Sequence, residues 1–174
     1  EIKLHDKVIA QLDGSIVILT GPEGEIKREF RDKKIKITYK NSSISLKAEK
    51  FSKVNKKLIK SYAAHIRNMI RGCTEAHKYM LKICSGHFPM NVSISNDQFI
   101  VKNFLGEKVP RILKIKPGAN IKIEGDLVMV GSLSKEIAGQ VSADIEQLTR
   151  RTGYDGRIFQ DGIHIINKDG KDIL

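Results

Sequence analysis

The sequence predicts an α+β fold with two tandem duplicated domains, each a mainly antiparallel sheet with one amphipathic helix packed on one face. Three observations predict it. Short segments alternate between apolar and polar residues and are separated by turn residues, which is typical of half-buried antiparallel strands. Two other segments repeat apolar residues every three or four positions, which is typical of a helix with one buried side. The same order of strands and helix occurs in both halves of the chain.

In the first half, strand segments precede the helix. Residues 15–20 form an apolar run, Gly21-Pro22-Glu23-Gly24 predicts a turn, and residues 25–30 predict the next strand. Residues 35–39 and 44–48 then alternate in a pattern that predicts a hairpin with one buried face.

The hairpin turn and the helix complete the first half. Asn41-Ser42-Ser43 is the predicted turn of the hairpin. We expect a helix over residues 55–71, ended by Gly72. Its apolar positions are Leu58, Ile59, Tyr62, Ala63, Ile66, Met69 and Ile70.

The second half repeats this plan. Residues 90–94 and 99–101 predict two strands joined by a turn at Asn96-Asp97. Residues 121–123 and 127–130 predict a further hairpin. The recurrence indicates two sheet-plus-helix units in succession.

A helix, a loop and a strand close the chain. Ser134 is suited to cap the second helix. The apolar side of this helix is formed by Ile137, Val141, Ile145 and Leu148. Residues 150–157 predict a loop with cations and an aromatic residue, and residues 163–166 predict a final strand. We divide the chain into domains 1–80 and 81–174, although boundaries near 78 and 88 fit equally well.

Charge is the strongest compositional feature. The 174 residues contain 31 Lys and Arg against 20 Asp and Glu, a net charge of +11, which attracts polyanions. Domain 1–80 is the more basic of the two. One stretch is especially rich in lysine and has Glu49 as its only acidic residue; it contains Lys47, Lys50, Lys53, Lys56, Lys57 and Lys60. Two interpretations stay open, a solvated lysine face or an arm that contacts phosphates.

The cysteine content and the hydropathy indicate in which cellular compartment the protein is expected. Cys73 and Cys84 are too few for a disulfide framework, and no charged-then-apolar signal precedes the first predicted strands. No run of about 18 apolar residues occurs that would span a membrane. We therefore expect a protein of the reducing cytoplasm with no membrane partner.

Motifs of catalysis are absent from the sequence. There is no nucleophile elbow, phosphate-loop lysine signature or dinucleotide fingerprint, and the carboxylates are scattered over polar segments. We expect neither an enzyme nor a small-molecule substrate or cofactor.

Four metal-ligating side chains lie within fifteen residues. Cys73, His77, Cys84 and His87 are of the types that bind zinc, but their spacing differs from the paired Cys-x-x-Cys pattern. A small buried cysteine is the more common outcome for such a position. A zinc-stabilised module is therefore a weaker alternative.

Nucleic acid is the partner that best matches the charge. The chain has no Trp and no obvious aromatic platform for stacking bases. Lysines, arginines and loop glycines suit a folded, helical RNA that is bound through its backbone. A free-standing basic RNA-binding regulator would share these features.

Several runs of residues closely resemble the universal large-subunit ribosomal protein six family, called protein nine in eukaryotic numbering. These runs are residues 65–72 (HIRNMIRG), 87–92 (HFPMNV), 103–108 (NFLGEK), 131–132 with 139–141, and 159–163 (FQDGI). The last run is similar to the eukaryotic and archaeal type. The zinc candidates other than His87 lie outside the matched pattern.

The resemblance implies a non-catalytic constituent of the large ribosomal subunit. Its C-terminal domain would bind large-subunit rRNA near the sarcin-ricin loop and the base of the factor-binding stalk. Its partners would be rRNA, neighbouring ribosomal proteins and nearby translation factors. The resemblance places the leading rRNA contacts at Lys108, Arg111, Lys114, Lys116, Lys135 and Gln140, and further contacts in the tail at Arg150, Arg151, Tyr154 and Arg157.

Overall fold

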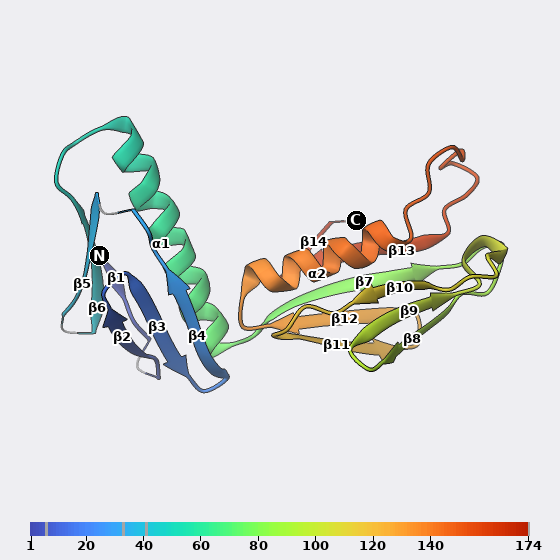
Figure 1. Ribbon diagram of the computed structural model, residues 1–174, viewed down its shortest axis with the longest axis horizontal. Coiled ribbons are helices and arrows are strands. Elements are labelled where there is room, and N and C mark those ends of the chain that lie inside the picture. Colours follow the sequence, from blue (N-terminus) through green and yellow to red (C-terminus); the bar gives the residue numbers. More distant parts are fainter. Residues whose placement is uncertain (6, 33, 41, 174) are drawn as a thin grey trace. The chain divides into compact units, whose positions relative to one another are not determined.

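The computed structural model describes residues 1–5, 7–32, 34–40 and 42–173, and their contacts divide the chain into two compact units (Figure 1). Unit 1 comprises Glu1–Ala76 and Leu133–Lys135, and unit 2 comprises His77–Ser132 and Glu136–Leu174. The division falls after Ala76, whereas the sequence analysis placed it after residue 80. The reason is that His77–Cys84 forms a strand of the sheet in unit 2.

Within its described residues, unit 1 contains two three-stranded antiparallel sheets and one long helix, α1 (Lys53–Thr74). The strands are β1 (Ile2–Lys3), β2 (Ile9–Asp13), β3 (Ile16–Gly21), β4 (Gly24–Glu29), β5 (Ile35–Lys40) and β6 (Ser43–Ala48). The strand orders are β1-β6-β5 and β2-β3-β4, which confirms the strands and the hairpin predicted from alternation. In the hairpin turn, Ser42 has a left-handed φ of 55°, while Asn41 lies outside the described residues.

Helix α1 packs one side against both sheets of unit 1. Ser52 caps it, since the Asn55 amide donates a hydrogen bond to the Ser52 hydroxyl at 3.0 Å. Its buried Ile66 and Met69 join the core formed with Val17, Leu19, Ile44 and their neighbours. This arrangement confirms the predicted amphipathic helix.

The predicted end of this helix at Gly72 is wrong. The helix continues to Thr74, and the Glu75 amide donates to the Arg71 carbonyl at 2.7 Å. Cys73 is fully buried and its thiol donates to the Leu19 carbonyl, so packing of the last turn outweighs the low helix propensity of glycine.

In the residues that are described, unit 2 contains a three-stranded sheet, a five-stranded sheet and helix α2 (Lys135–Leu148), with a short 3-10 turn η1 (Phe104–Gly106). The strands are β7 (His77–Cys84), β8 (Asn91–Ser95), β9 (Gln98–Lys102), β10 (Arg111–Lys114), β11 (Ala119–Glu124), β12 (Leu127–Ser132), β13 (Gly162–Lys168) and β14 (Lys171–Asp172). The orders are β10-β9-β8 and β11-β12-β7-β13-β14. The paired strands are antiparallel, which confirms the α+β class in both halves.

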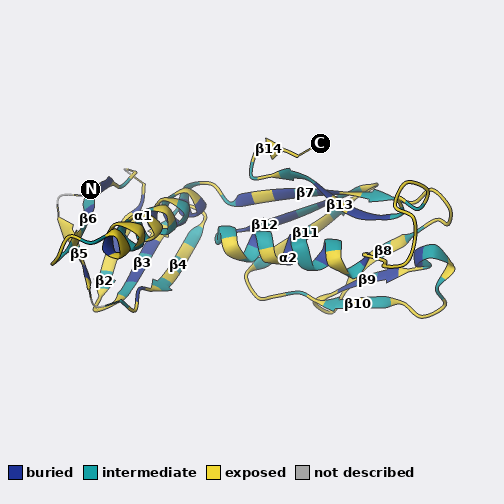
Figure 2. Cartoon of the chain, turned by 90° about the horizontal axis from the view of Figure 1, so that it is seen from above, coloured by how far each residue is buried: buried dark blue, intermediate teal, exposed yellow. Residues whose placement is uncertain are grey.

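Strand β7 is the central strand of the larger sheet, and the sequence analysis missed it. It lies between β12 and β13 and buries Tyr79 and Leu81 (Figure 2). The signal was present as alternation with Lys78 and Lys82. Its end residues, His77 and Cys84, are two of the four zinc candidates.

The core of unit 2 joins both of its sheets and α2. Val128 on β12 and Phe99 on β9 are fully buried, as is Ile145 on α2. This core fixes the positions of the segments that follow η1 and α2. No helix in the described part of the chain is both long and apolar enough to cross a membrane.

Candidate nucleic-acid interface

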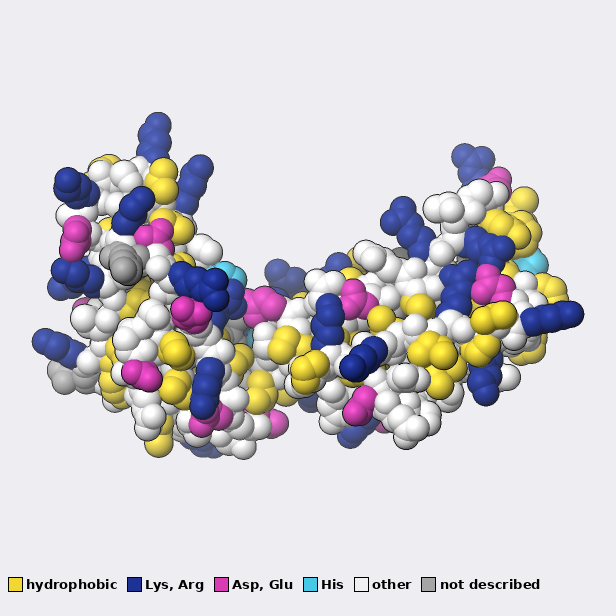
Figure 3. All heavy atoms as spheres, viewed as in Figure 1, with side chains coloured by type: hydrophobic (Ala, Val, Ile, Leu, Met, Phe, Trp, Pro, Cys, Tyr) yellow, Lys and Arg dark blue, Asp and Glu magenta, His cyan; other side chains and the backbone are white. Residues whose placement is uncertain are grey.

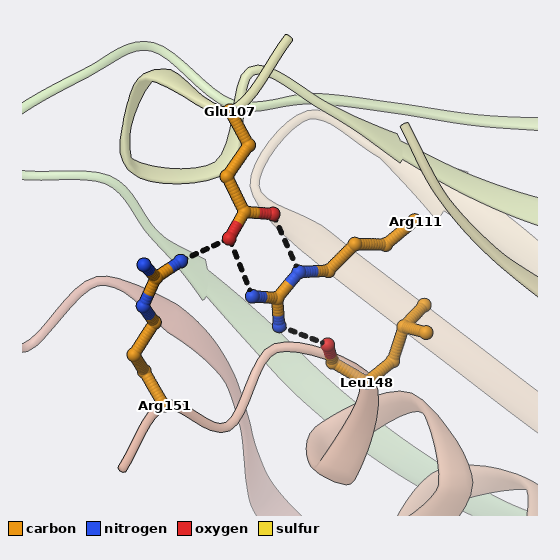
Figure 4. A network of polar contacts seen from close by, with 4 residues as sticks. All are labelled: Glu107, Arg111, Leu148 and Arg151. Atoms are coloured by element: carbon orange, nitrogen blue, oxygen red, sulfur yellow. Dashed lines mark hydrogen bonds and ion pairs between the residues drawn. The ribbon is translucent and has the colours of Figure 1, made fainter. Parts of the chain in front are cut away.

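The predicted contact Arg111 lies at the centre of a polar network at the start of β10 (Figure 4). Its Nε and Nη2 donate to the two carboxylate oxygens of Glu107 at 2.8 and 2.7 Å, and its Nη1 donates to the Leu148 carbonyl at 2.6 Å. The guanidinium also lies 4.4 Å from the centroid of the Phe104 ring. Arg111 therefore uses three of its N–H donors on internal partners and joins the segment after η1 to the end of α2.

Glu107 holds a second arginine in the same network. Arg151 Nη1 donates to Glu107 Oε1, so this carboxylate joins the segment before β10 to the loop after α2 (Figure 4). The hydrogen bond from Arg111, together with the charges of both arginines, outweighs burial and holds the pKa of Glu107 below its ordinary value. The carboxylate therefore stays charged at neutral pH.

The loop of residues 150–161 is built on a row of aromatic contacts. The Arg151 guanidinium lies 5.0 Å from the Tyr154 ring centroid, and Tyr154 meets Phe159 edge-on at 4.9 Å. Phe159 stacks on His87 at 4.8 Å. The loop is thus ordered by side chains although it has no helix or strand of its own.

Asp161 anchors the far end of this loop to the segment after β7. Its carboxylate accepts the amides of Gly86 and His87 at 2.7 and 3.0 Å, and contacts His87 Nδ1 at 2.5 Å. Burial raises the pKa of Asp161, but the hydrogen bonds from His87 and Gly86 outweigh it and leave the pKa below its ordinary value.

Two further predicted contacts share one carboxylate on α2. Lys116 Nζ lies 2.9 Å from Asp144 Oδ2, and Gln140 Nε2 donates to Asp144 Oδ1 at 2.8 Å. Burial raises the pKa of Asp144, but the hydrogen bonds from Lys116 and Gln140 outweigh it and lower the pKa below its ordinary value. The structure therefore brings Lys116 and Gln140 together.

The remaining candidates differ in their surroundings. Lys108, Lys114, Arg150 and Arg157 are exposed, and none has a side-chain ion pair with a described residue. Lys135 is the first residue of α2, and the division of the chain by contacts assigns it to unit 1. The cations of unit 2 thus fall into a group held by carboxylates and a group open to solvent.

The four zinc candidates lie on different elements and have other partners. Cys73 is buried at the end of α1, and His77 Nδ1 contacts Asp169 Oδ1 at 3.0 Å. Cys84 ends β7, and His87 pairs with Asp161. The described residues contain no cluster of three or more His, Cys, Asp or Glu arranged to hold a metal ion.

Sequence reasoning missed the residues that position the arginines. Glu107 lies in the matched run 103–108, and a spacing of four from Arg111 predicts an ion pair only within a helix, which this segment does not form. Nothing local connects Glu107 to Arg151. Their contact depends on the fold of unit 2.

The two-unit α+β fold, the excess of Lys and Arg and the set of exposed cations are features expected of a structural protein that meets a polyanion. Comparison with known proteins agrees. The family described as ribosomal protein L6 matches residues 6–76 and again 88–162. The chain therefore belongs to the ribosomal protein L6 family, and is a structural, non-enzymatic ribosomal protein of the cytoplasm.

Curated archaeal relatives match over nearly the whole chain. The large ribosomal subunit protein uL6 of Methanococcus vannielii is 39% identical over 98% of this chain and 94% of the relative. That of Methanothrix thermoacetophila is 36% identical over 96% and 95%, and that of Methanobrevibacter smithii is 37% identical over 97% and 95%. These relatives confirm the archaeal and eukaryotic type suggested by the sequence runs.

Proposed function

We propose that the chain is a constituent of the large ribosomal subunit and that unit 2 binds large-subunit rRNA. The binding region would lie near the sarcin-ricin loop and the base of the factor-binding stalk, next to stalk-base proteins and translation factors. The observation that carries the proposal is the set of exposed cations Lys108, Lys114, Arg150 and Arg157, none of which has an ion pair with a described residue. The names of the relatives support the choice of subunit.

The geometry supports two roles among the predicted contacts, since some side chains are open to bind phosphates and others hold the binding segments in place. The open cations neutralise phosphates, which releases counterions and drives binding. Arg111 acts as a positioning residue, because three of its N–H donors are already engaged by Glu107 and Leu148. Arg151 and Tyr154 shape the 150–161 loop that carries Arg150 and Arg157. Lys116, from the loop between β10 and β11, and Gln140, from α2, reach RNA beside Asp144, and Lys135 reaches it from the start of α2.

Sedimentation tests the choice of particle. A lysate is separated on a sucrose gradient at moderate and at high salt, and the chain is followed across free, small-subunit, large-subunit and monosome fractions. Co-migration with the large subunit that survives high salt is expected. Presence in the free fractions alone would contradict the proposal and indicate a free-standing regulator.

Chemical footprinting tests the contact residues. Large subunits depleted of the chain are supplied with wild type or with Lys108, Lys114, Arg150 and Arg157 all changed to Gln. The control changes Lys168 and Lys171 to Gln, two exposed lysines on β13 and β14. Protection of rRNA near the sarcin-ricin loop should be lost with the fourfold variant and kept with the control. Equal protection by the two variants would refute the assignment.

A further inference from the structure

The beginning of α1 carries a second concentration of cations, remote in sequence from the proposed rRNA contacts. We define the lysine patch as Lys50, Lys53, Lys56, Lys57 and Lys60, all of them exposed. Its four helical members follow one another at steps of three, one and three, which places them within about 100° of the helix circumference, on one side of α1. Figure 3 shows dark-blue Lys and Arg side chains around yellow hydrophobic ones at the end of unit 1 where α1 begins.

The lysine patch has no neutralising partner within the described residues. None of its five lysines forms an ion pair with a described carboxylate. Glu49, the nearest acid in the sequence, is held by Lys36 on β5 at 2.8 Å, and the hydrogen bond and charge of Lys36 lower the pKa of Glu49. A set of like charges this dense repels itself in the free protein, and an anionic partner relieves that repulsion.

An aromatic ring is presented beside these lysines. Phe51 is 94% exposed, the most exposed of the large hydrophobic residues described. The backbone around it is fixed, because Asn55 Nδ2 donates to the Lys50 carbonyl at 2.8 Å and Ser52 caps the helix. The ring is therefore held outward by an ordered segment.

The ring and the lysines share one surface hollow. Its lining includes Phe51 and Ile59 as apolar groups, with Lys50, Lys56 and Lys60 around them. An apolar face bordered by ammonium groups matches a nucleotide, whose base stacks on an aromatic ring while its phosphate meets cations. Protein–protein interfaces are enriched in arginine and depleted in lysine, and the cations of this patch are all lysines, so RNA fits better than an acidic protein.

We propose that the lysine patch and Phe51 form a second RNA-contacting surface, in unit 1, that binds a single-stranded or looped segment with one base on Phe51. The inference relies on the proposed function for its partner, RNA. It adds a separate contact to the one assigned to unit 2. Of the two interpretations of the lysine-rich stretch, it favours the arm that contacts phosphates over the solvated face.

The test measures how salt weakens binding of the full chain to transcribed large-subunit rRNA of its own organism, by filter binding between about 50 and 200 mM salt. The variant changes Lys50, Lys56 and Lys60 to Gln, and a second changes the same residues to Arg. The matched control changes Lys3, Lys7 and Lys40 to Gln, three exposed lysines of unit 1, of which Lys3 lies on β1 and Lys40 on β5. A separate pair changes Phe51 to Ala and to Tyr.

The patch variant should lower the slope of log affinity against log salt by about 2 to 3, at roughly 0.7 to 0.9 per lost phosphate contact, while the Arg variant retains it. Phe51→Ala should weaken binding about fivefold or more without changing the slope, and Phe51→Tyr should restore it. A patch variant indistinguishable from the control would overturn the inference and leave a solvated lysine face.

A unit 2 variant separates this inference from the proposed function. Changing Lys108 and Lys114 to Gln should weaken binding in the same assay if unit 2 binds rRNA. If only this unit 2 variant has an effect, the second surface is refuted and the proposed function stands. If only the patch variant has an effect, the second surface stands and the assignment of unit 2 fails. All these positions are exposed, and circular dichroism confirms that each variant is folded.

Discussion

Replacing Glu107 by Gln should destabilise unit 2 by removing one charge from beneath two arginines. The carboxylate accepts two hydrogen bonds from Arg111 and one from Arg151. The side chains of Arg111 and Glu107 are only 23% and 27% exposed, so water replaces these contacts poorly. The amide keeps the shape of the carboxylate, but its NH₂ group faces arginine donors.

The magnitude follows from the partial burial of this pair. Exposed ion pairs contribute about 0–1 kcal/mol, and breaking a fully buried pair costs about 3–5 kcal/mol. A bidentate pair that is about a quarter exposed lies between these limits, so we expect a loss of about 2 kcal/mol. For a domain of this size, that loss lowers the urea midpoint by roughly 1 M.

The assay is urea unfolding followed by circular dichroism at neutral pH, with Glu124→Gln as the control. Glu124 lies on β11, is exposed, and has no ion pair with a described residue. An equal midpoint for the two variants would refute the argument that Glu107 organises this region.

Acid provides an independent check on the same residue. The pKa of Glu107 is lowered in the folded protein, so its contribution is complete above the ordinary value of 4.5 and is lost as the pH falls through the lowered value. The difference in stability between wild type and Glu107→Gln should therefore shrink below about pH 4.5. A difference that stays constant down to pH 2 would contradict the role of the charge.

Three further predictions concern unit 1 and the thiols. Gly21→Ala should cost about 1–3 kcal/mol in thermal unfolding, because its Cβ would lie 2.6 Å from the Cys73 carbonyl oxygen, whereas Gly86→Ala, with open space around it, should be neutral. Burial raises the pKa of the Cys73 thiol and shields it, so a thiol reagent should modify the partly exposed Cys84 first. Faster modification of Cys73 than of Cys84 would refute the described packing. Lys53→Glu should stabilise the protein by about 0.3–1 kcal/mol, because α1 has no acid in its first turn. The same change should weaken RNA binding, because it removes a cation of the lysine patch. A variant that gains both stability and RNA affinity would contradict the second surface.

Much of the fold could be predicted because its signals are local. Alternation identified the hairpin of β5 and β6, and the spacing of three and four identified both helices. The recurrence of the pattern indicated duplication, and the charge indicated a polyanionic partner. These properties depend on neighbouring residues, whose side chains must share one face of an element to be buried together.

The sequence could not assign roles within the candidate site in the same way. It selected Arg111 and Arg151 by resemblance, and the fold shows both held by Glu107. It selected Lys114 for the same reason, and that side chain has no ion pair with a described residue. Which cations remain open depends on carboxylates that are distant in the chain.

What the sequence determined by itself was the α+β class, the duplication, most of the elements and the cationic character of the chain. The tertiary structure alone decided that β7 is the central strand, that α1 continues through Gly72 and that Phe51 faces solvent beside lysines that pair with no described carboxylate. The physical reason is that periodicity records which side of an element is buried, whereas pairing between strands and neutralisation of charges require contacts between segments far apart in the sequence.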